Sequence, residues 1–203
     1  MHDYPHRRLF NAGTHQGVRK ALPAAGVTTG TAALMAWALR AFGARSARFA
    51  FVVVWLPLAW FALLGRILAL RRPVLRLPAH VHALRGVERD GRVYELFGVR
   101  VAKWLLRRGP LAVFGPPDLR LPAEPTPATL ASLDARMRQA EALHEILLVV
   151  TLAVVVNAGV RGWWPAAGWT LLFNVLANGY PAMLQRYNRA LLAQRFGLPR
   201  HLA

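Results

Sequence analysis

Cysteine is absent from the 203-residue sequence, so disulfide bonds, thiolate metal sites and cysteine nucleophiles are excluded. Acidic residues are scarce: 9 aspartates and glutamates stand against 26 lysines and arginines, which gives a formal net charge of +17. Eight of these acids lie between positions 88 and 145, which makes this stretch the best candidate for acid–base chemistry. Lysine is nearly missing as well, since Lys20 and Lys103 are its only occurrences.

Apolar residues dominate what is present. They make up 55% of the sequence, and the mean hydropathy is +0.29. A water-soluble basic protein of this length would have too little polar surface to cover them, so we expect lipid to do so. The length suits one membrane domain over residues 1–203. The arginine excess reflects either codon bias or attraction to lipid headgroups or phosphate-bearing substrates; nucleic acid is disfavoured as a partner because no binding motif accompanies it.

Four segments have the length and the low charge needed to cross a bilayer. They cover residues 21–39, 49–70, 142–160 and 162–184. The sequence therefore predicts an all-α, polytopic membrane protein with about four transmembrane helices. Two alternatives stay open near the amino terminus: the first segment is a cleaved signal peptide, or residues 21–48 form a re-entrant pair.

Arginine and lysine outside these segments set the expected orientation. The stretch 71–138 carries thirteen of them, whereas the turn between the last two segments carries only Arg161. The turn after the first segment, with three arginines, is an exception to the rule. We therefore expect a multi-pass protein of the inner (cytoplasmic) membrane. Its cytoplasmic parts are the basic arm, the central region and the basic tail, at residues 1–20, 71–141 and 185–203.

The central region is divided by prolines but contains two helix signals. From Tyr94 to Arg108 the spacing predicts one amphipathic helix lying in the membrane interface, although Gly98 weakens the pattern. Its expected apolar face holds Phe97, Val101, Trp104 and Leu105, and its basic face holds Arg100, Lys103 and Arg107. Further on, Thr126 followed by Pro127 is typical of a helix start, so one helix is expected from there to Val160.

The first candidate site is Glu141-x-x-His144-Glu145, at the cytoplasmic start of the third segment. Residues three or four apart share a helix face, so a carboxylate lies beside the histidine. Such a carboxylate fixes the tautomer of histidine and raises its basicity, as a general base requires. The alternative is an interfacial histidine next to a glutamate that pairs with Arg138.

The second candidate is a polar stripe in the last segment and beyond it. Asn174, Asn178, Gln185 and Arg189 recur at helical spacing, and Gln185–Arg189 is a polar or amphipathic run. Amides in lipid need partners, so the alternatives are contacts between helices and a basic anchor beside the membrane. A third cluster, Glu88–Glu95, is by itself equally consistent with a surface turn.

Because the third segment runs outward and the fourth returns, we expect the Glu141–Glu145 end and the Gln185–Arg189 end to meet at one membrane face. The central region lies on the same face. Polar groups that converge at the lipid boundary suit a substrate that is part apolar and part polar.

These pieces together resemble one family. Glu-x-x-Gly-x-x-Tyr-Glu at Glu88–Glu95, Gly98-Val99, Lys103-Trp104, Glu141-x-x-His144 and the run Gln185–Arg189 occur in the order found in the glycosyl-4,4'-diaponeurosporenoate acyltransferase family. The similarity covers roughly residues 86–194. Its members are bacterial membrane enzymes of carotenoid biosynthesis that attach a fatty acyl chain to a sugar hydroxyl of a glycosylated carotenoid.

The resemblance implies O-acyl transfer to a lipophilic acceptor, without a cofactor beyond an acyl donor such as acyl-CoA or acyl-carrier protein, and without a metal. Under this hypothesis His144 is the base and Glu141 orients it. Asn188, Gln185 or Arg186 contacts the oxyanion or the donor phosphate, and Arg189 and Lys103 hold the phosphate of the acyl donor on the cytoplasmic side. Substrate contacts are expected from the remaining polar and basic residues of the three clusters, namely Arg186, Tyr187, Arg189, Asn178, Asn174, Glu95, Tyr94 and Lys103.

Two other functions compete with acyl transfer. Glu-x-x-His also occurs on the helices of di-iron proteins, although there it normally occurs twice. A non-catalytic membrane partner or assembly protein, docking through its basic face, is the second alternative. Metal analysis of the purified protein distinguishes the di-iron alternative from acyl transfer. Alanine at His144 distinguishes the non-catalytic alternative from acyl transfer.

Overall fold

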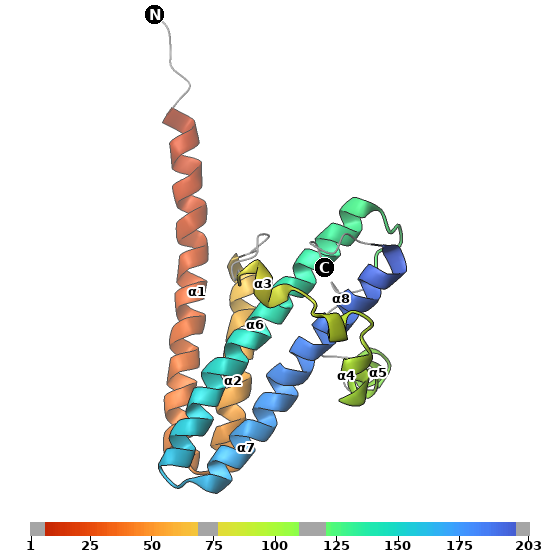
Figure 1. Cartoon of the computed structure of the whole chain (residues 1–203). Helices are drawn as coiled ribbons and strands as arrows, with labels where there is room; N and C mark the ends of the chain where they lie inside the picture. Colours follow the sequence, from red (N-terminus) through yellow and green to blue (C-terminus); the bar gives the residue numbers. More distant parts are fainter. Residues whose placement is uncertain (1–6, 69–76, 110–120, 198–203) are drawn as a thin grey trace, which may run out of the picture.

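The computed structural model describes residues 7–68, 77–109 and 121–197, and these residues contain helices and no strand. Figure 1 shows long helices packed side by side, with short helices against one flank. The elements are α1 Arg7–Phe42, α2 Ala47–Leu68, α3 Ala79–His82, η1 Gly86–Glu88, α4 Arg92–Leu96, α5 Val99–Arg107, α6 Pro127–Val160, α7 Trp164–Asn174, η4 Val175–Gly179 and α8 Tyr180–Phe196.

Three helical stretches are long and apolar enough to cross a membrane: Ala21–Phe42, Ala47–Leu68 and Pro127–Val160. Their most apolar windows are only 6%, 6% and 17% buried inside the protein. Large side chains such as Trp37, Phe51 and Val149 are therefore exposed, which a lipid environment explains and water does not. The expected all-α membrane fold is confirmed.

The expected fourth span, residues 162–184, is helical but not one regular α-helix. From Trp164 to Phe196 the chain is helical throughout, with five π-helical residues, Val175–Gly179, between α7 and α8. Pro181 lacks the N–H that would continue the α-helical pattern, and a π turn immediately before it accommodates the missing bond. A fourth crossing therefore stays a prediction.

The first two spans form a hairpin. Residues 21–42 belong to one uninterrupted helix, which is long enough to cross a bilayer, and the re-entrant alternative for 21–48 stays untested. The turn from α1 to α2 needs Gly43, whose φ is 73°, and the hydroxyl of Ser46 accepts a hydrogen bond from the N–H of Phe49. Signal-peptide cleavage stays untested.

The long helix expected from Pro127 to Val160 is confirmed as α6. Its N-cap is Thr126, whose side chain accepts a hydrogen bond from the N–H of Thr129. At the other end the guanidinium groups of Arg45 and Arg161 lie 5.1 and 5.3 Å from the ring of Trp163. The α1–α2 and α6–α7 turns therefore lie at the same end of the bundle (Figure 1).

The expected amphipathic helix from Tyr94 to Arg108 is wrong as a single element. Gly98 adopts a left-handed φ of 73° and divides it into α4 and α5. The two short helices pack on α8 through a buried apolar cluster of Tyr94, Val99, Leu184 and Tyr187. This packing brings the Glu88–Glu95 segment against the helix that carries Gln185–Arg189.

Candidate active site

Arg186, on α8, lies at the centre of a polar network that joins three distant parts of the chain. Its Nη1 donates to Oε1 of Glu141 at 2.7 Å, and its Nη2 donates to Oε2 of Glu88 at 3.0 Å. The same guanidinium donates to the carbonyl oxygens of Val81 and Ala83 and to the phenol oxygen of Tyr94. Arg186 therefore fixes the α3–α4 segment against α6 and α8.

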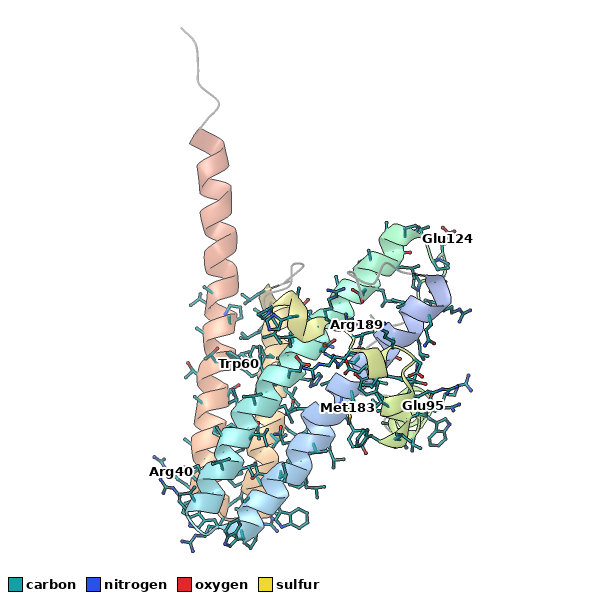
Figure 2. All side chains as sticks on the ribbon, viewed as in Figure 1. Arg40, Trp60, Glu95, Glu124, Met183 and Arg189 are labelled. Atoms are coloured by element: carbon teal, nitrogen blue, oxygen red, sulfur yellow. The ribbon has the colours of Figure 1, made fainter. Side chains whose placement is uncertain are left out.

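Arg189 lies one turn further along α8, with its side chain fully buried. Its Nε donates to Asp134 at 3.0 Å and its Nη1 to Oε2 of Glu141 at 2.7 Å. A third bond, from Nη1, goes to the carbonyl oxygen of His82. Figure 2 shows Arg189 in the interior, where α8 faces α6. Because two carboxylates neutralise it there, this buried charge is compensated.

These contacts correct the interpretation of Arg186 and Arg189 as clamps for a donor phosphate. Most of the guanidinium N–H groups of both residues already donate to protein oxygens, and a fully buried Arg189 does not reach a soluble donor. The expected convergence of the Glu141 and Gln185–Arg189 ends is nevertheless confirmed.

A second correction concerns the partner of Glu141. The expected neighbour was His144, but the histidine at this carboxylate is His82: its Nδ1 lies 3.2 Å from Oε1 of Glu141. Both side chains are buried, at 7% and 0% exposure. The two oxygens of Glu141 accept hydrogen bonds from Arg186 and Arg189, so the tautomer of His82 that suits this pair is the one whose Nδ1 donates to Glu141. In the neutral ring the lone pair is then on Nε2, which has no hydrogen-bond partner among the described residues.

His144 has an amide as its partner. Its Nδ1 lies 3.3 Å from Oδ1 of Asn178, whose Nδ2 donates to Oδ1 of Asn174 at 2.8 Å. Asn174 in turn donates to the carbonyl oxygen of Leu148 at 3.0 Å. The two asparagines are fully buried and use their amides to connect α6 with the π turn. This chain satisfies polar groups that would be costly in lipid.

Two tyrosine–carboxylate pairs fix α4, one to η1 and the other to α8. Tyr94 donates to Glu88, and Tyr187 donates to Glu95 at 2.9 Å. Burial raises the pKa of Glu88, but hydrogen bonds from Arg186 and Tyr94 outweigh burial, so the pKa lies below its ordinary value. Burial, together with the bond to Glu88, raises the pKa of Tyr94 well above its ordinary range. The Nζ of Lys103 lies 5.0 Å from the ring centre of Tyr187.

Three buried polar atoms have no hydrogen-bond partner among the described residues: Oε2 of Glu145, Oε1 of Gln185 and Nη2 of Arg189. Such atoms are rare among the buried polar groups of folded proteins. Gln185 is 5% exposed. Asn188 is half-buried, and its side chain makes no hydrogen bond to a described residue.

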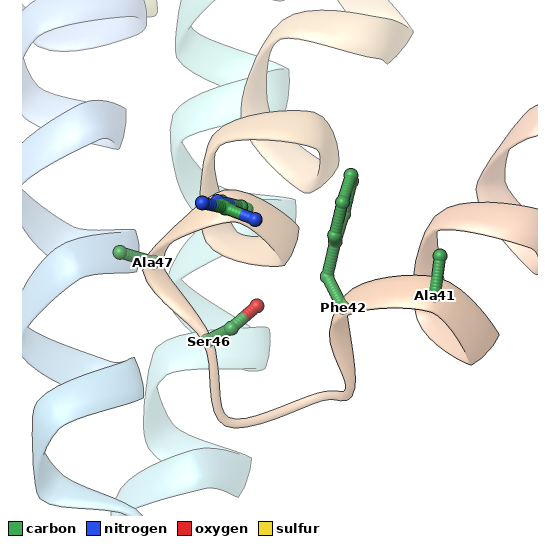
Figure 3. Close-up of a pocket in the computed structure, with 5 residues that line it drawn as sticks. Ala41, Phe42, Ser46 and Ala47 are labelled. Carbon is green, nitrogen blue, oxygen red and sulfur yellow. The ribbon is translucent and has the colours of Figure 1, made fainter.

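Two surface depressions lie away from the Arg186 network. Figure 3 shows a depression at the α1–α2 turn, lined by Ala41, Phe42, Ser46, Ala47 and Arg48. It holds no group suited to acid–base catalysis. A second, almost entirely apolar depression lies between α2 and α7, beside Phe51 and Trp169. Neither depression is lined by residues of the Arg186 network. The candidate site is therefore identified by the chemistry of its residues and not by the size of a cavity.

Sequence reasoning missed His82 and Asp134 as members of the site. Asp134 had a readable signal, because Asp134, Glu141 and Glu145 recur at helical spacing and face the stripe that ends in Arg189. His82 had none, since 59 residues separate it from Glu141. Among the residues described, no group of three histidine, aspartate or glutamate side chains is arranged to hold a metal ion.

The profile of the glycosyl-4,4'-diaponeurosporenoate acyltransferase family matches residues 78–195, which is more than half of the chain. The chain belongs to this family. It is accordingly an acyl-transfer enzyme, and the family implies an acyl donor and a lipophilic acceptor. Comparisons with curated proteins and with solved structures gave no match. The matched range contains every residue of the Arg186 network and excludes α1 and α2.

Proposed function

We propose that this enzyme moves a fatty acyl group from a thioester donor, such as acyl-CoA or acyl-carrier protein, to a hydroxyl of a glycosylated carotenoid or similar glycolipid. The observation that carries the proposal is a histidine–carboxylate pair, His82 and Glu141, buried where the matched segment meets α6 and α8. The same surroundings hold unpaired amide and carboxylate atoms.

Acyl transfer to an alcohol needs a base that removes the hydroxyl proton. His82 suits this step because Glu141 fixes the proton on Nδ1 and leaves Nε2 as the acceptor. As the acceptor oxygen bonds to the thioester carbon, the proton passes to Nε2. The carboxylate then stabilises the resulting imidazolium, which afterwards protonates the departing thiolate.

The carbonyl oxygen of the donor gains negative charge during the attack, and N–H donors stabilise it. Gln185 and Asn188 are suited to this task, because both lie on α8 and neither side-chain NH2 group donates to a described residue. We assign His144 and Asn178 to binding the acceptor, since a neutral amide orients a histidine but adds little basicity.

The apolar part of the acceptor and the acyl chain come from lipid. α6 exposes Val149, Val150 and Val156 beside the polar interior, and α7 exposes Trp169, Leu171 and Leu172. An acceptor that diffuses in the inner leaflet of the cytoplasmic membrane reaches this boundary laterally. No resident cofactor is needed for the steps described.

The experiment is a transfer assay with the purified full chain in liposomes. We incubate it with a carotenoid glycoside and a panel of acyl-CoA and acyl-carrier-protein donors, and follow products by mass. The proposal predicts a product heavier by one acyl group, lost on mild ester hydrolysis. Donor hydrolysis without transfer, or no turnover with any acceptor that bears a sugar hydroxyl, contradicts it.

A further inference from the structure

The α4–α5 corner carries an exposed apolar face that its packing does not use. Leu96, Phe97, Val101 and Trp104 are 86%, 58%, 62% and 56% exposed. Leu96 and Phe97 lie at the end of α4, and Val101 and Trp104 on α5, so the face continues across the bend at Gly98. Four large apolar side chains together on the surface of a small two-helix unit indicate an interaction surface.

This exposed apolar face is separate from the side of α5 that packs in the protein core. α5 buries a different side, because Val99 is fully buried and Leu106 packs against the cluster formed with Leu184 and Tyr187 of α8. The corner is also fixed in place: Tyr187 donates to Glu95, and its ring lies 3.0 Å from where a Cβ on Gly91 would sit. This corner of the molecule, where Figure 2 labels Glu95, therefore has a defined direction relative to α8.

Cations border the face. The Arg100 side chain is 72% exposed, and Arg108 is exposed at the end of α5. Glu95 lies 3.6 Å from Arg100 and already accepts a hydrogen bond from Tyr187. An apolar row with arginines at its border complements an anionic lipid surface: the row enters the acyl boundary and the arginines reach the phosphates.

We propose that the α4–α5 face, defined as Leu96, Phe97, Val101 and Trp104 with Arg100 and Arg108, is a lipid-binding surface that inserts into an anionic leaflet. A bilayer is available because the same chain carries three helices apolar enough to cross one. Since Tyr94 and Glu95 lie on this corner, its insertion sets the depth of the Arg186 network at the headgroups. The inference does not depend on acyl transfer.

The absence of cysteine allows a direct test with single labelled positions. We place a nitroxide at Val101→Cys in the full chain. Val149→Cys, on the exposed apolar side of α6, is the lipid-facing reference, and Ser132→Cys, on the exposed polar start of α6, is the water-facing reference. All three are exposed, so labelling disturbs no packing, and circular dichroism checks the helix content.

Collision rates with oxygen and with a water-soluble nickel chelate are measured in vesicles of phosphatidylcholine, with and without phosphatidylglycerol. The proposal predicts that the oxygen-to-nickel ratio at position 101 lies near that of position 149 in anionic vesicles. The ratio moves towards that of position 132 when Arg100 and Arg108 are both changed to glutamate.

Three results overturn the proposal. A ratio like that of position 132 in both vesicle types places the face in water. Dipolar broadening between labels assigns it to a second copy of the chain. A lipid-like ratio that neither phosphatidylglycerol nor the charge reversal changes removes the anionic headgroups from the assignment.

Discussion

The α1–α2 hairpin and the α6–α8 pair are both built from long helices, yet different forces fix them. Between α1 and α2 the side-chain hydrogen bond found in the described residues joins Trp60 to Thr28, at 3.1 Å, and most apolar side chains face outward. Between α6 and α8 a buried apolar cluster, which includes Leu133 and Leu192, is joined by buried ion pairs, with Glu141 and Arg189 fully enclosed. Lipid stabilises the first pair, whereas specific side-chain geometry stabilises the second.

This contrast explains why the candidate active site lies between α6 and α8 and not in the α1–α2 hairpin. Apolar contacts tolerate small shifts, so a hairpin in lipid does not hold reacting groups within the narrow limits that catalysis requires. A network of charge-assisted hydrogen bonds with fixed directions does hold them. Four predictions test the contrast between the two regions.

Arg189→Met gives the largest expected effect. Removing the guanidinium leaves the carboxylates of Asp134 and Glu141 buried without their shared cation. The loss expected for breaking a buried ion pair is about 3–5 kcal/mol of unfolding free energy. Denaturation of the protein in detergent, followed by circular dichroism, measures it. Arg92→Met is the control, because this arginine pairs with Asp90 while 86% exposed, and about 0.5 kcal/mol or less is expected. Equal losses in the two variants would contradict the account.

Two glycines with the same backbone conformation compare the regions directly. Gly43 in the hairpin turn and Gly91 before α4 have φ of 73° and 74°. A Cβ at position 43 meets nothing within 4 Å, whereas at position 91 it comes 3.0 Å from the Tyr187 ring. Gly→Ala is expected to cost about 1 kcal/mol at position 43, from the backbone alone, and about 2–3 kcal/mol at position 91. A larger loss at Gly43 would reverse the comparison.

Gln185→Met separates stability from function. The buried Oε1 of Gln185 lacks a partner in the described structure, and such an atom destabilises the fold. An apolar side chain of similar size should raise the unfolding free energy by about 1 kcal/mol. At the same time turnover should fall about 100-fold, if the amide acts on the oxyanion. A variant that loses both stability and activity would instead indicate a structural role.

Glu88 gives the smallest effect, and it depends on pH. The pKa of Glu88 is lower in the folded protein, so its stabilising contribution is present above its unfolded pKa and is lost as pH falls through the folded value. The stability difference between wild type and Glu88→Gln should stay constant from about pH 6 to 8 and shrink below about pH 4. A stability difference between wild type and Glu88→Gln that grows as the pH falls would contradict the predicted direction of the pKa shift.

Much of the fold was predictable because local signals decided it. Thr126-Pro127 and an uncharged run defined α6 to the residue, since capping and hydropathy act within a few positions. The helix predicted from Tyr94 failed at Gly98, where the left-handed conformation ended α4. A periodic pattern does not by itself show that a glycine inside it will break the helix.

The site was predictable in its parts but not in its pairing. Glu141, Gln185 and Arg186 were marked by their spacing and by antiparallel helices, and the structure brings them together. The predicted partner of Glu141 was wrong because two histidines, His82 and His144, competed for this one carboxylate. Arg186 donates hydrogen bonds to backbone carbonyls on either side of His82, and these bonds position His82 beside Glu141. The spacing of residues within α6 contains no information about this contact.

The most direct measurement compares acyl-transfer rates of His82→Gln and His144→Gln in liposomes, at equal amounts of folded protein. A general base contributes about 10²–10⁴ in rate. If Glu141 orients His82 for proton removal, the first variant loses at least about 100-fold in kcat, while the second loses about tenfold or less, mainly through KM. Near-wild-type turnover of His82→Gln, with the large loss moved to His144→Gln, would contradict this assignment.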